Sequence, residues 1–425
     1  MREMKDSGIK WIGVIPSAWR TARVKNVAET MQSGGTPDSS NDTFYVDIEG
    51  GIPWVAIADM STTPYVKDTN KHISEEGRKS KNLIVFEPGT ILYAMYASVG
   101  KVSELAVPAT INQALLAIVL NSSIDGSFFK YALNAWEPYI ISESNGTTQF
   151  NLNANKVANL CFPMPNRLEQ ESIVRYLDTK CAQVDTLIAN VQAQIEKLKA
   201  YKQSLITEVV TKGLDHTVPM KDSGVAWIGE IPAHWKIKRG KVLFEESDAR
   251  SADGSEELLT VSQYTGITPR SQKNVNMFEA LTLEGYKLCD VGDIAANTMW
   301  LWAGAIGVSA YSGVISPSYN VYRQKAENFV PSYLDCLLRA PMLVQEYASR
   351  STGIRASRLR LYPKDFLDIM FPVPPVDEQQ DIMSVLSEKF AAVDKLIAIK
   401  KSKIEKLEQY KKSLIYEYVT GKKEA

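Results

Sequence analysis

The chain contains a long internal repeat, which limits the folds that it can adopt. KDSGIKWIGVIPSAW at residues 5–19 returns as KDSGVAWIGEIPAHW at residues 221–235, with ten of fifteen positions identical. A second pair, residues 162–213 and 371–422, aligns without a gap at an offset of 209 and is identical at about half of its positions. Two homologous halves in one chain tend to pack about a pseudo-twofold axis, so we expect reciprocal contacts between the halves.

The residues between the repeated pieces, 20–161 and 236–370, look largely unrelated to each other. Each segment mixes short apolar runs with Gly, Pro, Asn and Asp, which favours an α+β domain built from several short strands. The expected elements are strands at residues 91–96, 115–120 and 314–322, and helices at residues 127–136 and 332–338.

The second repeated piece predicts a long helix in both halves. Prolines in FPMP and FPVP favour extended chain before it. The expected N-caps and their capping-box partners are Asn166 with Glu169 and Asp377 with Gln380. Gly213 and Gly421 are expected to end the helices as C-cap glycines. Each helix is then roughly 45 residues long, on the order of 65 Å.

Apolar residues step through both helices by alternating fours and threes, which is the pattern of a heptad seam. The seam also includes Cys181, Val191, Val209, Phe390 and Tyr418, and the seam residues expected to pair the helices are Leu177, Val184, Ile188, Ile195, Leu198 and Leu205 in the first helix, and Leu386, Val393, Ile397, Ile404, Leu407 and Leu414 in the second. Lys202 and Lys411 interrupt both seams at the same place, and Lys400 interrupts the second. Such a stripe is also typical of a helix buried in a single core. The length, the lack of internal Gly or Pro and the two copies favour antiparallel pairing of the two helices.

The predicted fold class is α+β, with two α/β domains separated by two long antiparallel helices that form a coiled-coil spacer. The expected segments are a first domain at 1–165 with its constant segment at 4–19, a helix at 166–214, a second domain at 215–374 with its constant segment at 220–235, and a helix at 375–425. The second helix ends the chain, whereas its matching KDSG segment begins the chain. The order therefore resembles a ring cut open, and the termini should lie near each other.

Composition excludes several classes of protein. No signal peptide and no run of about eighteen apolar residues is present, which predicts a cytoplasmic protein. The four cysteines form no CxxC pair and the three histidines no HExxH, so we expect no metal site and no cofactor. The net charge of −1 argues weakly against DNA binding, although acidic and basic faces can cancel in the sum.

Two polar loops of the first variable segment carry residue types that bind phosphates and adenine edges. They are SGGTPDS at residues 33–39 and SNGTTQFNLNANK at residues 144–156. The candidate DNA contacts are Gly35, Thr36, Asn145, Thr147, Thr148, Gln149, Asn151 and Lys156. Ordinary surface turns explain such composition equally well.

The second variable segment carries a cluster of arginines in SRSTGIRASRLRLYPK at residues 349–364. Arginine contacts guanine bidentately and also binds phosphate. The candidate DNA contacts are Arg350, Thr352, Arg355, Arg358 and Arg360. The alternative is a solvated face whose arginines pair with carboxylates.

The constant pieces together resemble the specificity subunit of type I restriction-modification systems. KDSGxxWIGxIPxxW, a variable block, FPxPxxxEQ and a helix ending in KxSLIxExVT occur twice, and the resemblance covers the whole chain. PGTILYAMYASVGK with PATINQALLAI (88–118) resembles one class of target-recognition domain, and VGDIAANTMWLWAGAIG with GVISPSYNVY (291–322) resembles another.

This resemblance implies that each domain reads one half of a bipartite, asymmetric site in double-stranded DNA. It also implies that the helices hold the domains at a fixed spacing and bind two adenine-methyltransferase subunits, which restriction subunits then join. The chain itself would be non-catalytic.

Enzyme motifs are weak in this chain. The nearest methyltransferase-like motif, PVPPVDE at 372–378, reads as a helix-entry turn, and no GxxxxGK(S/T) loop occurs. Pro37-Asp38 lacks the acidic-x-Lys triplet that a nuclease would need. Two alternatives stay open: a symmetric protein-binding scaffold without a DNA role, and the targeting subunit of a related system whose partner fuses methylation and cleavage.

Overall fold

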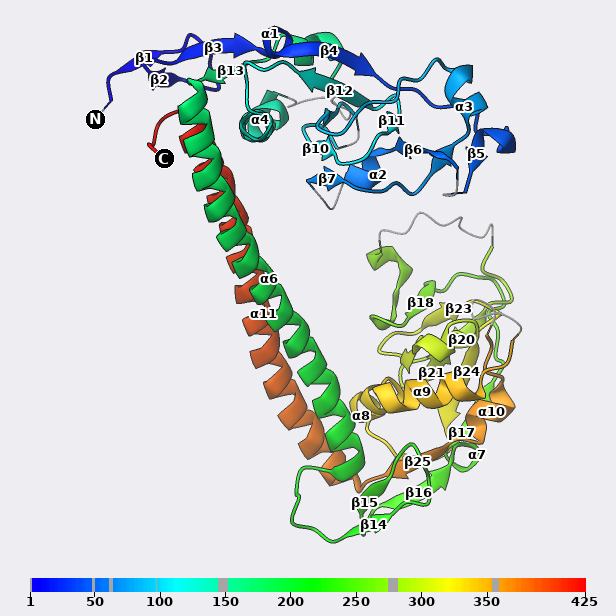
Figure 1. The fold of residues 1–425 in the computed structure, drawn as a ribbon. Helices are drawn as coiled ribbons and strands as arrows, with labels where there is room; N and C mark the ends of the chain where they lie inside the picture. The colour runs from blue at the N-terminus through cyan, green and yellow to red at the C-terminus, as the bar shows by residue number, and fades with distance from the viewer. Residues whose placement is uncertain are drawn as a thin grey trace. The chain divides into compact units, whose positions relative to one another are not determined.

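The computed structural model describes residues 2–47, 50–60, 64–96, 98–143, 152–273, 282–353 and 359–425. The chain forms two units, Met1–Val191 with Ser402–Ala425 and Gln192–Lys401. Each unit contains one of the two variable segments and a stretch of both long helices (Figure 1).

A five-stranded sheet forms the centre of the first unit. Its order is β4 (Ala28–Ser33), β12 (Leu115–Leu120), β9 (Ile91–Ala94), β10 (Val102–Leu105) and β7 (Tyr65–Val66), antiparallel except for β7. A second sheet has the order β11 (Thr110–Ile111), β6 (Ile52–Val55), β8 (His72–Ile73) and β5 (Tyr45–Val46). Two further pairs are β1 (Met4–Asp6) with β2 (Val14–Pro16), and β3 (Arg20–Arg23) with β13 (Cys161–Met164).

The helices before α6 are α1 (Val24–Val27), α2 (Ile57–Met60), α3 (Glu75–Ser80), α4 (Gly126–Glu143) and α5 (Ala154–Ala158). Apolar residues of α4 and of the central sheet share one core, which includes Phe128, Leu133 and Tyr93.

The second unit repeats the centre of this sheet although its sequence differs. The order β17 (Phe244–Ser247), β24 (Asn320–Gln324), β21 (Ile294–Ala296) and β22 (Ile306–Val308) follows β4-β12-β9-β10 of the first unit. Paired beside it are β18 (Leu259–Ser262) with β19 (Gly266–Pro269), β20 (Lys287–Cys289) with β23 (Gly313–Ile315), β14 (Met220–Asp222) with β15 (Glu230–Pro232), and β16 (Lys236–Arg239) with β25 (Met370–Val373). Its shorter helices are α7 (Gly240–Leu243), α8 (Pro331–Leu338), α9 (Pro341–Arg350) and α10 (Pro363–Leu367).

Most predicted elements of the variable segments are present. β12 has the predicted bounds, β9 ends two residues early, α8 starts one residue early, and α4 runs on to Glu143. The single strand predicted at 314–322 is wrong, because it is two strands, β23 and β24. Pro317 has no N–H for a strand ladder, and the Tyr319 N–H donates to the Ser316 carbonyl at 2.9 Å, which turns the chain between them.

The two long helices have nearly the predicted length. α6 (Arg167–Lys212) has 46 residues and α11 (Val376–Val419) has 44. Asn166 caps α6 as predicted, since its Oδ1 accepts the Glu169 N–H at 3.0 Å. The predicted cap Asp377 is wrong, because α11 already includes it.

Pro375 occupies the position in α11 that Asn166 occupies in α6. The Gln379 N–H donates to the Pro375 carbonyl at 3.0 Å, and the Gln170 N–H donates to the Asn166 carbonyl at the same distance. Proline suits the start of a helix because its φ is already helical and its missing N–H needs no partner there. Both helices therefore begin in the same register of the repeat.

The seam residues expected to pair the helices are turned away from solvent. Seven are buried: Leu177, Val184, Ile195, Leu205, Leu386, Val393 and Leu414. The other five are half-buried: Ile188, Leu198, Ile397, Ile404 and Leu407. The heptad prediction therefore identified the interior face of each helix.

The lysines that interrupt the seams make reciprocal contacts. In the first unit, Lys411 Nζ lies 2.6 and 2.7 Å from the carboxylate oxygens of Asp185. In the second unit, Lys202 Nζ lies 2.8 and 2.9 Å from those of Asp394. These residues are equivalent at the offset of 209, so each unit contains the same Lys–Asp contact between the two helices.

Further contacts show that the helices run antiparallel in each unit. Tyr176 and Tyr418 stack in the first unit with ring centroids 4.4 Å apart. In the second unit Lys400 Nζ donates to Gln194 Oε1 at 2.6 Å. In both units, partners later in α6 meet partners earlier in α11.

Glycines end both helices, and the chain termini meet. Gly213 and Gly421 have φ of 72° and 70°, the left-handed conformation predicted for C-cap glycines. Arg2 Nε lies 2.9 Å from Glu424 Oε1, which confirms the predicted proximity of the termini. Tyr416 also donates from its hydroxyl to the Trp11 carbonyl at 3.0 Å, so the end of α11 packs on the first constant segment.

We predict that Ile195→Asp destabilises the chain by at least about 3 kcal/mol, because it places an unpaired carboxylate at a site that is 1% exposed. Leu187→Asp is the control, since Leu187 lies on the same helix but is 48% exposed. Its expected effect is within about 0.5 kcal/mol. Urea unfolding followed by circular dichroism at 222 nm compares the two; equal midpoints would contradict the burial of the seam.

We predict that Gly421→Ala costs more stability than Gly224→Ala. Both glycines have positive φ, so both variants carry a backbone strain of about 1–2 kcal/mol. A Cβ at Gly421 would lie 2.4 Å from Pro16 Cδ, whereas one at Gly224 would meet nothing within 4 Å. Thermal unfolding of the two variants measures the difference. An equal fall in Tm would show that α11 does not end against the constant segment.

Candidate nucleic-acid interface

In the first variable segment, the described residues of the two predicted polar loops approach one edge of the central sheet. β4 ends at Ser33, beside the start of β12. The Met95 N–H, just after β9, donates to the Ala114 carbonyl at 2.9 Å, and the Leu152 N–H donates to the Met95 carbonyl at 3.2 Å. Segments that begin at residues 34 and 152 therefore lie at the same sheet edge.

The glycines of the SGGTPDS loop are used in packing. A Cβ at Gly34 would lie 1.8 Å from the Ile111 carbonyl oxygen, so only glycine fits there. The Gly35 N–H donates to the same oxygen at 3.0 Å, and the Gly35 carbonyl accepts from Trp54 Nε1 at 3.0 Å. Gly35 therefore shapes the loop, with both of its backbone polar groups engaged inside the domain.

Thr36 contributes a polar side chain at this edge. Its hydroxyl donates to Oε1 of Gln113, which lies in the turn between β11 and β12. Gln113 was missed in the sequence, where the only signal was its place just before a predicted strand. Amide and hydroxyl groups of this kind can bind base edges or phosphates.

The remaining candidates of this segment fall into two groups. Lys156 lies on α5, whose N-cap Asn153 accepts the Lys156 N–H at 2.9 Å. Outside the described residues lie Asn145, Thr147, Thr148, Gln149 and Asn151.

Asp38 stays charged in the same loop. Hydrogen bonds from the backbone N–H and the hydroxyl of Ser40, at 3.0 and 2.8 Å, lower the pKa of the Asp38 carboxyl. Its carboxylate oxygen thus accepts hydrogen bonds within a local turn.

Within the described ranges, no cluster of three or more His, Cys, Asp or Glu side chains could hold a metal ion.

In the second variable segment, two candidate residues face each other across the base of a loop. The Thr352 N–H donates to the Arg360 carbonyl at 3.0 Å, and the Arg360 N–H donates to the Thr352 carbonyl at 2.9 Å. Both side chains are exposed. Arg355 and Arg358 fall between them, outside the described residues. This bridge holds Thr352 and Arg360 beside each other.

Arg350 is engaged elsewhere. It ends α9, and its Nε lies 2.6 Å from Glu346 Oε1 one turn earlier. This pairing is the carboxylate alternative expected for the cluster. Arg360, by contrast, makes no ion pair with any other residue that the structure describes, which makes it the stronger candidate.

In addition to the arginine cluster, the second unit has an exposed pair of tryptophans that was not predicted from the sequence. Trp300, which follows β21, is 51% exposed and stacks with Trp302 at a centroid distance of 5.7 Å. Gly304, at the end of this turn, approaches Val344 of α9, the helix that leads to Arg350. Exposed aromatic faces can stack with unpaired bases. The sequence signal was the pair of tryptophans in a loop after a strand.

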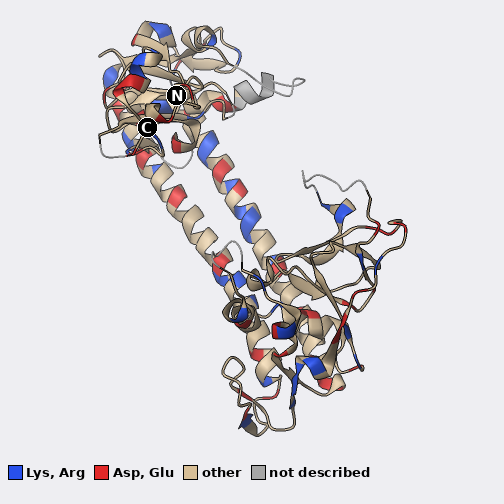
Figure 2. Ribbon diagram, turned by 90° about the vertical axis from the view of Figure 1, so that its right-hand side faces the viewer, with Lys and Arg blue, Asp and Glu red and all other residues tan. Residues whose placement is uncertain are grey.

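Several other arginines of the second unit are committed to internal carboxylates. Arg323 lies 2.7 Å from Asp290 and 2.9 Å from Asp293, and the hydrogen bond that its guanidinium donates to the Asp293 carboxylate raises the pKa of Arg323. Arg250 lies 2.9 Å from Asp248. Figure 2 shows charges of both signs interspersed on the ribbon. Arg250 and Arg323 are therefore weaker candidates for phosphate contact than a loop arginine with no carboxylate partner.

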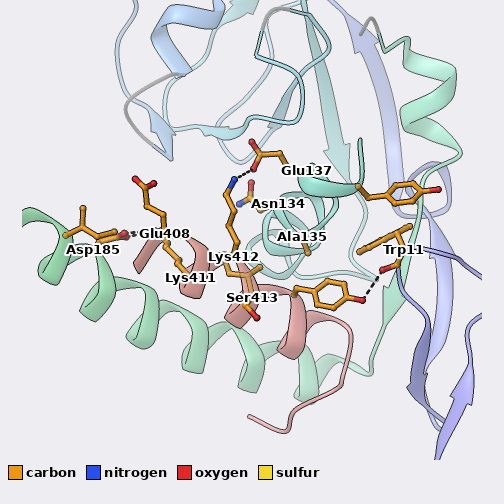
Figure 3. A pocket seen from close by; sticks show the side chains of 13 residues that line it. Trp11, Asn134, Ala135, Glu137, Asp185, Glu408, Lys411, Lys412 and Ser413 are labelled. Atoms are coloured by element: carbon orange, nitrogen blue, oxygen red, sulfur yellow. Dashed lines mark hydrogen bonds and ion pairs between the residues drawn. The ribbon is translucent and has the colours of Figure 1, made fainter. Parts of the chain in front are cut away.

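A pocket of about 910 Å³ lies in the first unit between the constant segment, α4 and the paired helices (Figure 3). Its lining includes Trp11, Glu137, Asp185 and Lys411, and Lys412 Nζ lies 3.4 Å from Glu137 Oε2. Several lining residues recur in the other half of the repeat: Trp11 as Trp227, Asp185 as Asp394, Lys411 as Lys202 and Ser413 as Ser204. The pocket therefore belongs largely to the constant part of the chain.

Comparisons with known proteins find relatives along nearly the whole chain. Residues 16–197 match the model of the type I restriction modification DNA specificity domain. The putative type I restriction enzyme MjaX specificity subunit of Methanocaldococcus jannaschii is 24% identical over 97% of this chain and 95% of its own length. The MjaVIII specificity subunit of the same organism is 23% identical over 96% of this chain and 93% of its own length.

A solved structure shares the fold. One chain, from work on complex assembly and conformational transition of the type I restriction-modification system, matches with a TM-score of 0.64 and 15% identity. The match covers 95% of this chain and 98% of that chain. Every helix in the described part of the chain is too short or too polar to span a lipid bilayer. The chain is therefore similar to type I restriction-modification specificity subunits over nearly its whole length, and residues 16–197 match the specificity-domain model.

Proposed function

We propose that this subunit recognises a bipartite, asymmetric site in double-stranded DNA, with one half-site read by each variable domain. The observation that carries the proposal is the repeated sheet order β4-β12-β9-β10 and β17-β24-β21-β22, with unlike loops in the two copies. The same framework then presents two different sets of side chains. Different side chains at base edges select different bases, so the two half-sites would differ.

The paired helices α6 and α11 would hold the two readers at a fixed separation. Each helix is uninterrupted over more than forty residues, and the seam and the reciprocal Lys–Asp contacts tie the helices together in both units. A rigid spacer of this kind fixes the number of unread base pairs between two half-sites.

The constant parts would bind two methyltransferase subunits, which restriction subunits then join. Two copies of one partner would bind two equivalent surfaces, and the internal repeat provides such surfaces. They include the helix residues that line the pocket of Figure 3. Methylation and ATP-dependent cleavage would reside in these partners. A methyltransferase must flip the adenine out of the duplex, and the specificity subunit would hold the flanking DNA while this happens.

The proposal is tested by mapping methyladenine in DNA from a host that carries this subunit with its methyltransferase. The expected result is one motif of two unlike half-sites with a constant number of undefined bases between them. A continuous motif would contradict the two-reader arrangement. The sequence of the partner distinguishes a separate methyltransferase from a fused methyltransferase-nuclease, and methylation that is unchanged without this subunit would favour the protein scaffold without a DNA role.

We predict that Arg360→Ala weakens binding to duplexes that carry the natural motif by about 5- to 150-fold, the effect of losing about 1–3 kcal/mol of DNA contact. Arg350→Ala is the matched control, because its guanidinium already pairs with Glu346 at 2.6 Å and should change binding little. Fluorescence anisotropy with the methyltransferase complex measures both variants. Equal losses in the two variants would remove Arg360 from the interface.

The pair of Thr36 and Gln113 gives the corresponding prediction for the first domain. Gln113→Ala removes the amide that accepts from Thr36 and should relax sequence preference at one half-site by about tenfold. Asn41→Ala, a cap residue of a nearby turn, is the control. Binding to duplexes altered at single positions of either half-site provides the measurement. A preference as strict as that of the unmodified subunit would exclude this edge of the sheet.

A further inference from the structure

Two glutamines of the repeated motif FPxPxxxEQ are buried where each variable domain joins a long helix. Gln170 is 1% exposed and Gln379 is 0% exposed, and they are equivalent at the offset of 209. A buried amide is tolerated when its oxygen and its N–H groups all find partners, so the partners indicate what the side chain does.

In the first unit, the Gln170 amide joins the starts of two helices. Its Oε1 accepts the N–H of Asp125 at 2.8 Å, and Asp125 immediately precedes α4. Its Nε2 donates to the carbonyl of Pro165 at 2.9 Å, in the turn that leads into α6. One side chain therefore ties the domain helix to the spacer helix.

The second unit contains the same joint. Gln379 Oε1 accepts the N–H of Val330 at 2.8 Å, and Val330 is the N-cap residue of α8. Gln379 Nε2 donates to the carbonyls of Asn328 and Pro374 at 2.9 and 3.0 Å. α8 follows the central strand β24 as α4 follows β12, so the two joints hold equivalent helices.

In both joints the variable domain contributes only backbone atoms to the glutamine. Asp125 stands at this place in one domain and Val330 in the other, and in each case the N–H is the group that is bound. A backbone N–H at a helix start is free of any intrahelical partner, whatever the side chain. The joint therefore does not depend on the sequence of the domain that it holds.

We propose that Gln170 and Gln379 are positioning residues that fix the angle between each recognition domain and the helical spacer. They do so through backbone groups that recognition domains of unrelated sequence can offer. This inference rests on the proposed function, since a fixed angle matters because two half-sites must be met at one separation. Loss of the amide leaves buried backbone groups without partners and lets the domain tilt on the helix.

The test measures spacer discrimination by the subunit in complex with its methyltransferase. Duplexes carry the mapped half-sites with the natural spacer or with a spacer one base pair longer or shorter. We expect Gln379→Leu to lower the preference for the natural spacer by about tenfold, and Gln170→Leu to do the same. Gln380→Leu is the matched control, because Gln380 is the next residue and is exposed. Partial unfolding lowers the active fraction equally on all duplexes, so it does not change this ratio.

Gln379→Glu is the replacement variant for the same measurement if the leucine variants do not fold. It keeps an oxygen for the Val330 N–H and removes the N–H groups bound by Asn328 and Pro374, so a smaller loss of discrimination is expected. Discrimination in the Gln170 and Gln379 variants equal to that of Gln380→Leu would overturn the inference while the proposed function stands. An assembled, unmodified subunit that binds none of the duplexes would overturn the proposed function and this inference with it.

Discussion

The pairing of α6 with α11 is the interaction on which the rest of the structure depends. Its apolar seam supplies the stability, because burying such side chains is worth about 1.5–3 kcal/mol each. The contacts of Lys202 with Asp394 and of Lys411 with Asp185 add little energy, since exposed ion pairs contribute about 0–1 kcal/mol. These ion pairs specify the register of the two helices. A lysine in an apolar seam is tolerated where a carboxylate lies beside it, so the pairs favour one alignment of the helices.

A constant frame built in this way accepts variable domains with little shared sequence. The hairpins of the constant segments, the buried Trp19 and Trp235, and the left-handed glycines at the helix ends recur in both units. Glu378 illustrates how closely these parts fit, since it accepts from Trp235 Nε1 at 2.9 Å and contacts His234 Nε2 at 2.8 Å. The variable domains in turn keep the order of four central strands and differ in the loops at their edges.

Internal ion pairs account for part of the charge balance in this chain of net charge −1. Arg250, Arg323 and Arg350 are held by carboxylates of their own domain. Two candidate pairs, Thr36 with Gln113 and Arg360 with Thr352, are held in place by a side-chain hydrogen bond and by a backbone bridge.

The sequence by itself determined the repeat, the length and seam of the helices, their glycine ends and the proximity of the termini, because periodicity and special backbone residues act over short stretches of chain. It also indicated the strands at 91–96 and 115–120. Tertiary structure decided the rest: that 314–322 is two strands, that Pro375 and not Asp377 opens α11, that Arg350 turns to Glu346, and that Gln113 meets Thr36. These outcomes depend on which groups lie close to one another in the folded chain. The order of residues in the sequence does not give those distances.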